Sequence, residues 1–124
     1  MADILTPLIE QRADPHIYRH SDGYYYFTAS VPQYDRIELR RADSIAGLAD
    51  AQTVDVWHKP ETGPYSELVW APELHFNQGA WYVYFAAAPS REIKHKLFQH
   101  RMYAIRNTNA NPLIGEWEFM GQID

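Results

Sequence analysis

The sequence contains no cysteine, so no disulfide framework holds the chain together and its stability depends on packing. It also has no apolar run that approaches the roughly 18 residues of a membrane-spanning helix. Basic residues are not in excess: the formal net charge is -5, which argues against a nucleic acid or another polyanion as the main partner. We therefore expect a packed domain of 124 residues that binds neither nucleic acid nor membrane.

A secretion signal is missing from the first ten residues. The segment from Met1 to Glu10 includes Asp3 and has no basic stretch followed by an apolar one. The expectation from these residues is a cytoplasmic protein.

Aromatic residues are what the sequence has in excess. Four Trp, nine Tyr and five Phe make up 15% of the chain. Such side chains suit the half-buried surface of a strand, and they also stack on sugar rings. We expect most of them in a strand core, with a few left as candidates for carbohydrate contact.

The chain reads as short strands separated by turns, with no helical periodicity of any length. A turn or short helix is predicted for Asp43 to Ala51, and a protruding polar loop for Arg91 to His100. The expected strands cover residues 16–19, 24–29, 36–41, 53–57, 68–76, 81–88, 102–106 and 116–120. This pattern predicts an all-β fold.

An internal repeat organises these strands. The segment 22–29 resembles the segment 78–87, with Tyr26-Phe27 matched to Tyr84-Phe85 at a spacing of about 58 residues. Each unit offers four short strands, which is the content of one β-propeller blade, and the repetition favours this fold over a four-plus-four β-sandwich. We expect one catalytic domain over 1–124, with blade one at about 10–66 and blade two at about 67–124.

Two blades do not complete a propeller, because the ring typically closes with four to eight of them. We expect the remaining blades to be absent from this chain. Uncovered apolar faces and blade edges would then favour self-association, or pairing with a complementing chain.

Two carboxylates stand near the starts of the inner strands. Asp14 precedes Pro15, which restricts the backbone, and Glu73 occupies the matching place of the second unit. Inner strands line the channel of a propeller, so both side chains are expected to converge there. Glycoside hydrolysis uses such a pair, one to activate water and one to protonate the leaving oxygen.

The motifs around these carboxylates resemble glycoside hydrolase family 43, which contains arabinofuranosidases, arabinanases and xylosidases on a five-bladed propeller. The resemblance runs roughly from Leu8 to Gln122. The motif Trp70-Ala71-Pro72-Glu73-Leu74-His75 is most similar to that of members that act on α-L-arabinofuranosides. The residues that carry the resemblance are Ala13-Asp14-Pro15-His16-Ile17-Tyr18, Asp22-Gly23-Tyr24-Tyr25-Tyr26, Trp70-Ala71-Pro72-Glu73-Leu74-His75 and Trp81-Tyr82-Val83-Tyr84-Phe85.

The resemblance implies a role for three of these residues. Asp14 matches the general base that activates water for inversion, Glu73 an acidic position close to the sugar, and Trp70 an aromatic that contacts it. The family's general acid, a Glu of a later blade, has no counterpart in this sequence, and neither has its pKa-modulating Asp. We therefore expect the isolated chain to have little or no turnover, since general acid assistance is commonly worth 10²–10⁴-fold.

Histidines are the remaining candidates. His16 and His75 could donate to sugar hydroxyls or serve as hydrogen-bonded core residues. His95 and His100 lie among basic residues, without the Cys or carboxylate spacing of a zinc site, and are expected in a solvated loop. No metal or cofactor is expected.

Two functions follow from these observations. The first is a glycosidase, or a piece of one, that cleaves α-L-arabinofuranosyl or related pentose linkages in arabinose- or xylose-containing oligosaccharides. The second is a carbohydrate-binding or interaction module whose aromatic residues hold a glycan without cleaving it. Calorimetry and an assay of hydrolysis distinguish the two.

Overall fold

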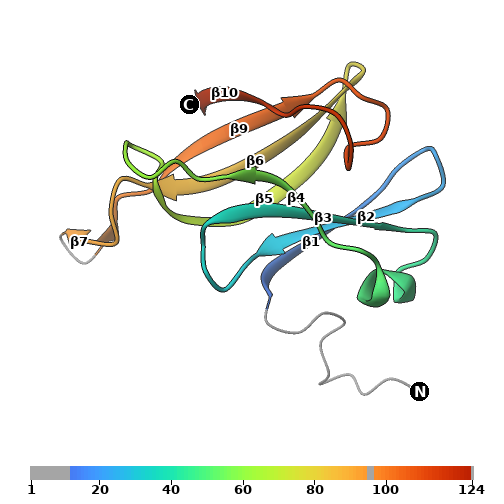
Figure 1. Cartoon of the computed structure of the whole chain (residues 1–124), viewed down its shortest axis with the longest axis horizontal. Helices are drawn as coiled ribbons and strands as arrows, with labels where there is room; N and C mark the ends of the chain where they lie inside the picture. The colour runs from blue at the N-terminus through green and yellow to red at the C-terminus, as the bar shows by residue number, and fades with distance from the viewer. Residues whose placement is uncertain (1–11, 95–96, 124) are drawn as a thin grey trace.

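The computed structural model describes residues 12–94 and 97–123. In this part of the chain, two four-stranded antiparallel sheets lie against each other (Figure 1). The strands of the first sheet are β1 (Ala13–Arg19), β2 (Tyr25–Ser30), β3 (Arg36–Ala42) and β4 (Val54–His58). Those of the second are β5 (Glu67–Asn77), β6 (Ala80–Ala88), β9 (Arg101–Asn107) and β10 (Glu118–Ile123).

Each sheet is a meander whose strands follow one another in the chain. The order is β1-β2-β3-β4 in the first sheet and β5-β6-β9-β10 in the second, and no strand crosses from one sheet to the other. A small hairpin of β7 (Ile93–Lys94) and β8 (Leu97–Phe98) is inserted between β6 and β9, where the sequence predicts a loop. This is the connectivity of two successive propeller blades. No helix of the described residues has the length and apolarity that a membrane crossing requires.

The turn between β1 and β2 is built by Asp22 and Gly23. Gly23 has a φ of +90°, a conformation that costs glycine little because it has no Cβ. Asp22 accepts a hydrogen bond from the backbone N–H of Tyr24 at 2.9 Å and another from the buried hydroxyl of Tyr26 at 2.6 Å. The turn is thereby tied to the core.

The main core lies between the two sheets. Strand alternation puts Trp81, Val83 and Phe85 of β6 on the face that meets the first sheet, which contributes Tyr26. Trp81 is fully buried and packs on Tyr26 with ring centroids 4.9 Å apart. Burial of this size dominates the energetics of a fold without disulfides.

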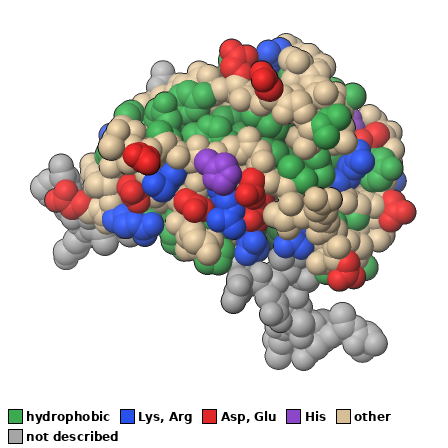
Figure 2. Space-filling model, viewed as in Figure 1, with side chains coloured by type: hydrophobic (Ala, Val, Ile, Leu, Met, Phe, Trp, Pro, Cys, Tyr) green, Lys and Arg blue, Asp and Glu red, His purple; other side chains and the backbone are tan. Residues whose placement is uncertain are grey.

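The outer end of this core is aromatic. Trp57 of β4 lies 4.9 Å from Phe85, and Tyr65 stacks on Phe119 of β10 at 4.3 Å. Figure 2 shows hydrophobic side chains gathered on the surface between these two outer strands. Partly exposed rings therefore join the two outermost strands.

The outward faces of the two sheets differ. A 3-10 helix, η1 (Ala46–Asp50), covers the first sheet through Leu48, which packs with Phe27 and Ala29. The second sheet presents Tyr82 and Tyr84, whose rings stack 5.9 Å apart, and no described element covers them. In a propeller this second face meets the following blade.

The registers refine the internal repeat. His16 pairs with Thr28 in the first sheet, and Glu73 pairs with Tyr84 in the second. Each pair lies directly after a bulge, so Thr28 and Tyr84 are equivalent positions. Tyr26 lies two residues before Thr28, and its counterpart is therefore Tyr82, two residues before Tyr84. Tyr82 and Tyr84 lie on the same face of β6, because faces alternate with every residue, so a slip of two residues does not change the face of the matched side chain.

Candidate functional site

A pocket of about 250 Å³ lies where the inner strands β1 and β5 meet. Both carboxylates that the sequence singles out line it, Asp14 from β1 and Glu73 from β5. The full lining is Asp14, Pro15, His16, Ala71, Pro72 and Glu73. The two strands thus bring an Asp-Pro and a Pro-Glu dipeptide to opposite walls of one small hollow.

Asp14 sits in a bulge with an unusual backbone. Its φ is +51°, and the pairing of β1 with β2 shifts register between Ala13 and His16. A side chain with a Cβ rarely adopts the left-handed region, at a cost of roughly 1–2 kcal/mol. The bulge turns the exposed Asp14 carboxyl into the pocket, as bulges near functional sites often do.

A buried serine supports this carboxyl. Ser30, at the end of β2, is 2% exposed. Its hydroxyl donates to Asp14 Oδ2 at 3.2 Å and accepts the backbone N–H of Ala71 at 2.7 Å. Ser30 therefore connects the Asp14 bulge of the first sheet to β5 of the second.

The second sheet contains a matching bulge. Ala71 has a φ of +52° and, like Asp14, precedes a proline, and β5 shifts register between Trp70 and Glu73. The structural counterpart of Asp14 is therefore Ala71, and that of His16 is Glu73. The prediction that Glu73 occupies the place matching Asp14 is wrong by two residues, although both carboxylates line the pocket.

His16 and His75 lie beside the carboxylates. His16 Nε2 donates to the carbonyl of Leu74 at 3.0 Å, so in the neutral ring Nδ1 is left as an acceptor. The His75 ring lies 5.3 Å from that of His16, and its Nε2 is 3.6 Å from Glu73 Oε1. Glu73 itself is well exposed, because its apolar neighbour Leu74 points into the core on the other side of β5.

Trp70 does not line this pocket. One face of its indole is covered by His100, which stacks at 3.8 Å, and Tyr34 approaches edge-on at 5.6 Å. His100 also donates to the carbonyl of Leu68 at 3.0 Å, and burial lowers its pKa. The expectation of a solvated loop is therefore wrong for His100, while His95 lies outside the described residues.

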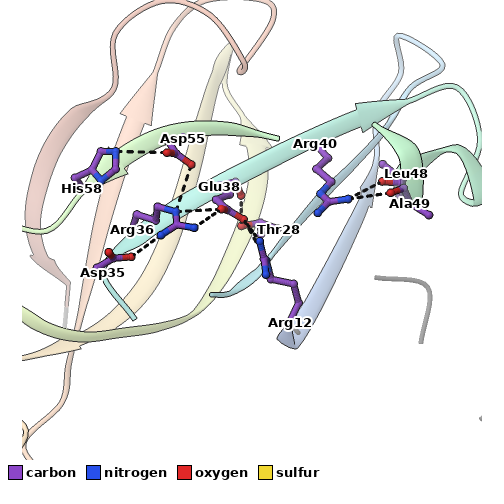
Figure 3. Close-up of polar contacts among 10 residues, drawn as sticks. All are labelled: Arg12, Thr28, Asp35, Arg36, Glu38, Arg40, Leu48, Ala49, Asp55 and His58. Carbon is purple, nitrogen blue, oxygen red and sulfur yellow. Dashed lines mark hydrogen bonds and ion pairs between the residues drawn. The ribbon is translucent and has the colours of Figure 1, made fainter. Parts of the chain in front are cut away.

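An ion-pair network fixes the chain just before Asp14 (Figure 3). Arg12 bonds to Glu38 Oε2 at 3.0 Å, and Arg36 bonds to Glu38 Oε1 at 2.9 Å. Glu38 is almost fully buried, and its backbone carbonyl accepts the hydroxyl of Thr28 at 2.8 Å. The start of β1 is thus tied to β3 across the intervening strand.

Larger hollows lie away from the carboxylate pair. One of about 660 Å³ at the turn between β9 and β10 is lined by the polar residues Arg106, Asn107, Glu116 and Glu118, among others. Another of about 590 Å³ lies around Val31 to Tyr34 and shares Ser30 with the site. Neither brings two carboxylates together beside a histidine, so the small pocket remains the chemically richest site. Among the described residues, no group of three or more His, Asp or Glu could hold a metal ion.

Comparison with known proteins points to one family. The family described as glycosyl hydrolases family 43 matches residues 4–124. The chain is 52% identical over 118 residues to an extracellular exo-α-(1→5)-L-arabinofuranosidase of Streptomyces avermitilis, and 48% identical over 118 residues to one of Streptomyces chartreusis. These alignments cover 95% of this chain but 24% and 35% of the relatives, so the chain spans about a quarter to a third of their length.

The fold has the same likeness. The crystal structure of an α-L-arabinofuranosidase from Lactobacillus brevis superimposes with a TM-score of 0.90 at 53% sequence identity. The match covers 95% of this chain and 38% of that one. It confirms the predicted all-β fold of propeller blades and excludes the β-sandwich.

The same comparisons correct the predicted location. Two relatives are named extracellular enzymes, which points to a secreted protein, so the expectation of a cytoplasmic protein is wrong. The expectation rested on the segment from Met1 to Glu10. Because the family match begins at residue 4, most of this segment belongs to the family's domain and gives no information about a leader.

Proposed function

This chain belongs to glycosyl hydrolases family 43, and we propose that it forms the base-bearing part of an enzyme that hydrolyses α-L-arabinofuranosyl linkages with inversion. The names of the relatives favour removal of terminal α-(1→5)-linked L-arabinofuranosyl groups from arabinose-containing oligosaccharides. Residues 1–124 would belong to one propeller domain, with blades at about 10–66 and 67–124.

The observation that carries this proposal is the pocket shared by Asp14 and Glu73. Asp14 is exposed, so water can reach its carboxylate, and the bulge and Ser30 hold the side chain toward the pocket. A water-activating carboxylate needs this combination of access and fixed orientation.

In the proposed reaction, the Asp14 carboxylate takes a proton from water while the water oxygen forms a bond to the anomeric carbon. The bond from this carbon to the leaving oxygen breaks, and the leaving oxygen takes a proton from a general acid on the opposite face of the sugar. Inversion needs the acid and the base roughly 6.5–9.5 Å apart, to leave room for the water. We do not assign the acid to Glu73, which shares its side of β5 with His75 at 3.6 Å.

We assign substrate contacts to the residues around this base. Glu73 accepts hydrogen bonds from sugar hydroxyls, and His16 offers Nδ1 as an acceptor because its Nε2 is engaged with Leu74. His75 lies beside both His16 and Glu73 and can bond to the same sugar. We keep Trp70 as a sugar contact outside the pocket that Asp14 and Glu73 line, through the face of the indole that His100 leaves open.

We also propose that the polypeptide of residues 1–124, when expressed alone, associates with itself or with a complementing chain. The stacked Tyr82 and Tyr84 leave an aromatic surface on the second sheet, and such a surface favours contact with another copy or a complementing chain. In the complete protein we expect a further blade to cover it.

The test is Asp14→Asn in the complete gene product. Hydrolysis of 4-nitrophenyl α-L-arabinofuranoside is expected to fall by about 10²–10⁴-fold, with little change in affinity for arabino-oligosaccharides measured by calorimetry. Asp50→Asn, which changes an exposed acid on η1, is the matched control and should retain full activity. The anomer released first, followed by NMR, reports inversion.

Two outcomes contradict the proposal. Unchanged hydrolysis by Asp14→Asn removes Asp14 from the role of base. Binding of arabino-oligosaccharides by the unmodified protein without any hydrolysis favours the carbohydrate-binding module instead.

A further inference from the structure

We propose that Ser30 is a positioning residue for Asp14, and that it sets the orientation of the carboxylate through a contact with the neighbouring blade. The inference rests on the proposed function, in which Asp14 is the base. It adds a second residue to the reaction, one that does not touch the substrate.

The direction of the Ser30 hydrogen bonds follows from its partners. The backbone N–H of Ala71 can only donate, so at 2.7 Å it occupies a lone pair of the Ser30 oxygen. The single hydroxyl proton then points to Asp14 Oδ2 at 3.2 Å. This distance exceeds the usual O–H···O distance of about 2.7 Å, so the bond orients the carboxylate more than it polarises it.

Asp14 needs such an orienting contact. Its side chain is exposed and belongs to a backbone with a φ of +51°, and an exposed side chain of this kind is free to change rotamer. The bond to Ser30 engages Oδ2, which assigns Oδ1 to the proton transfer from water. A carboxylate held in this way accepts the proton of the attacking water in a fixed geometry.

The contact also links the two blades. Ala71 belongs to the bulge of β5 that directs Pro72 and Glu73 to the pocket, while Ser30 and Asp14 belong to the first sheet. One buried hydroxyl therefore bonds to both walls of the pocket. Together with the bond from His16 to the carbonyl of Leu74, this hydroxyl links the strands that carry Asp14 and Glu73.

The experiment compares Ser30→Ala with Ser66→Ala in the complete gene product. Ser66 is an equally buried serine whose hydroxyl donates to the carbonyl of Gly63 at 2.8 Å, away from the pocket. With 4-nitrophenyl α-L-arabinofuranoside as substrate, Ser30→Ala should lower kcat about 10- to 100-fold with KM within about twofold, since one charged hydrogen bond is lost. Ser66→Ala should leave both constants unchanged.

A double-mutant cycle separates positioning from general support of the fold. If Ser30 acts through Asp14, adding Ser30→Ala to Asp14→Asn causes no further loss of the residual rate. An equal loss in both backgrounds, or a kcat of Ser30→Ala within about twofold of the unmodified protein, overturns the inference. Full activity of Asp14→Asn instead overturns the proposed function, so the two failures are distinct. If Ser30→Ala does not fold, Ser30→Cys replaces it, because a thiol is a weak donor of similar shape, and the same loss is expected.

Discussion

Tyr26 shows how a single residue joins the turn of a blade to its core. The ring is fully buried against Trp81, while the hydroxyl reaches Asp22 in the turn at 2.6 Å. Burial, together with the hydrogen bond to Asp22, raises the pKa of Tyr26 from 10.0 to about 12. Between pH 10 and about 12, the Tyr26 hydroxyl is therefore still protonated in the folded protein but already ionised in the unfolded chain.

The alkaline stability of the protein is expected to depend on this proton. The contribution of Tyr26 is complete below pH 10, where the unfolded chain also holds the proton, and is lost as the pH rises to about 12. Between pH 10 and about 12 the unfolding free energy of the unmodified protein should fall as this contribution is lost. In Tyr26→Phe, which has no hydroxyl proton to lose, this fall should be smaller by about 2 kcal/mol. Urea unfolding at several alkaline pH values measures it, with the exposed Tyr24→Phe as control. Identical slopes for Tyr26→Phe and the unmodified protein contradict the prediction.

Site residues could be predicted from sequence only where the signal is local. Asp14 and Glu73 stand in compact motifs beside prolines, and both line the pocket. Ser30 was missed because its importance depends on a bulge in β1 and on a backbone N–H in the other sheet. His100 was missed for the same reason: its partner Trp70 is brought close by the fold of the second sheet.

At the scale of the strands, the alternation of apolar and polar residues and the positions of turn residues were sufficient to predict the longer strands. Strands such as Ala80–Ala88 and Arg101–Asn107 are long, apolar on one face and bounded by turns, so the sequence predicts them within one or two residues. The two-residue strands Ile93–Lys94 and Leu97–Phe98 were missed, because segments this short carry no periodicity. The repeat was misplaced by two residues, because the dipeptide Tyr26-Phe27 recurs at Tyr84-Phe85 in the sequence, whereas the registers make Tyr82 the counterpart of Tyr26.

The stability of the first sheet also depends on buried charges, which the alternation of apolar and polar residues does not predict. Glu38 is buried in β3 and accepts hydrogen bonds from Arg12 and Arg36. Glu38→Gln removes the negative charge between two cations, and breaking such a pair leaves a buried charge poorly compensated. We expect a loss of roughly 1–3 kcal/mol of unfolding free energy, since Arg36 retains Asp35 and Asp55 as partners.

Denaturant unfolding of Glu38→Gln measures this loss. The exposed Glu116→Gln is the control, because it changes the net charge by the same amount without touching the network. Equal stability of the two variants would show that the network contributes nothing measurable.

At the scale of the whole molecule, two blades share one core and leave one face open. Met102 is 40% exposed and lies on the open face of the second sheet beside Ala86, next to the strand that carries Tyr82 and Tyr84. In the complete protein we expect a further blade to cover this face. The polypeptide of residues 1–124 expressed by itself leaves it in water.

We therefore expect this isolated polypeptide to associate as its concentration rises. Met102→Lys should reduce the association, because it places a charge in the apolar contact. Ile114→Lys, which changes an exposed residue of the loop before β10, should not. Sedimentation velocity measures the association. If the unmodified polypeptide and both variants are monomeric at every concentration, the proposed self-association is wrong.

The contact between Ser30 and Ala71 has a practical use, because its two residues lie on either side of the connection between the sheets. A gene divided within residues 59–66 would encode Asp14 and Ser30 on one piece and the amide of Ala71 on the other. Neither piece alone would orient the carboxylate, whereas docking of the pieces would restore it. The linker between the blades is thus a natural cut point for a reporter whose signal depends on reassembly.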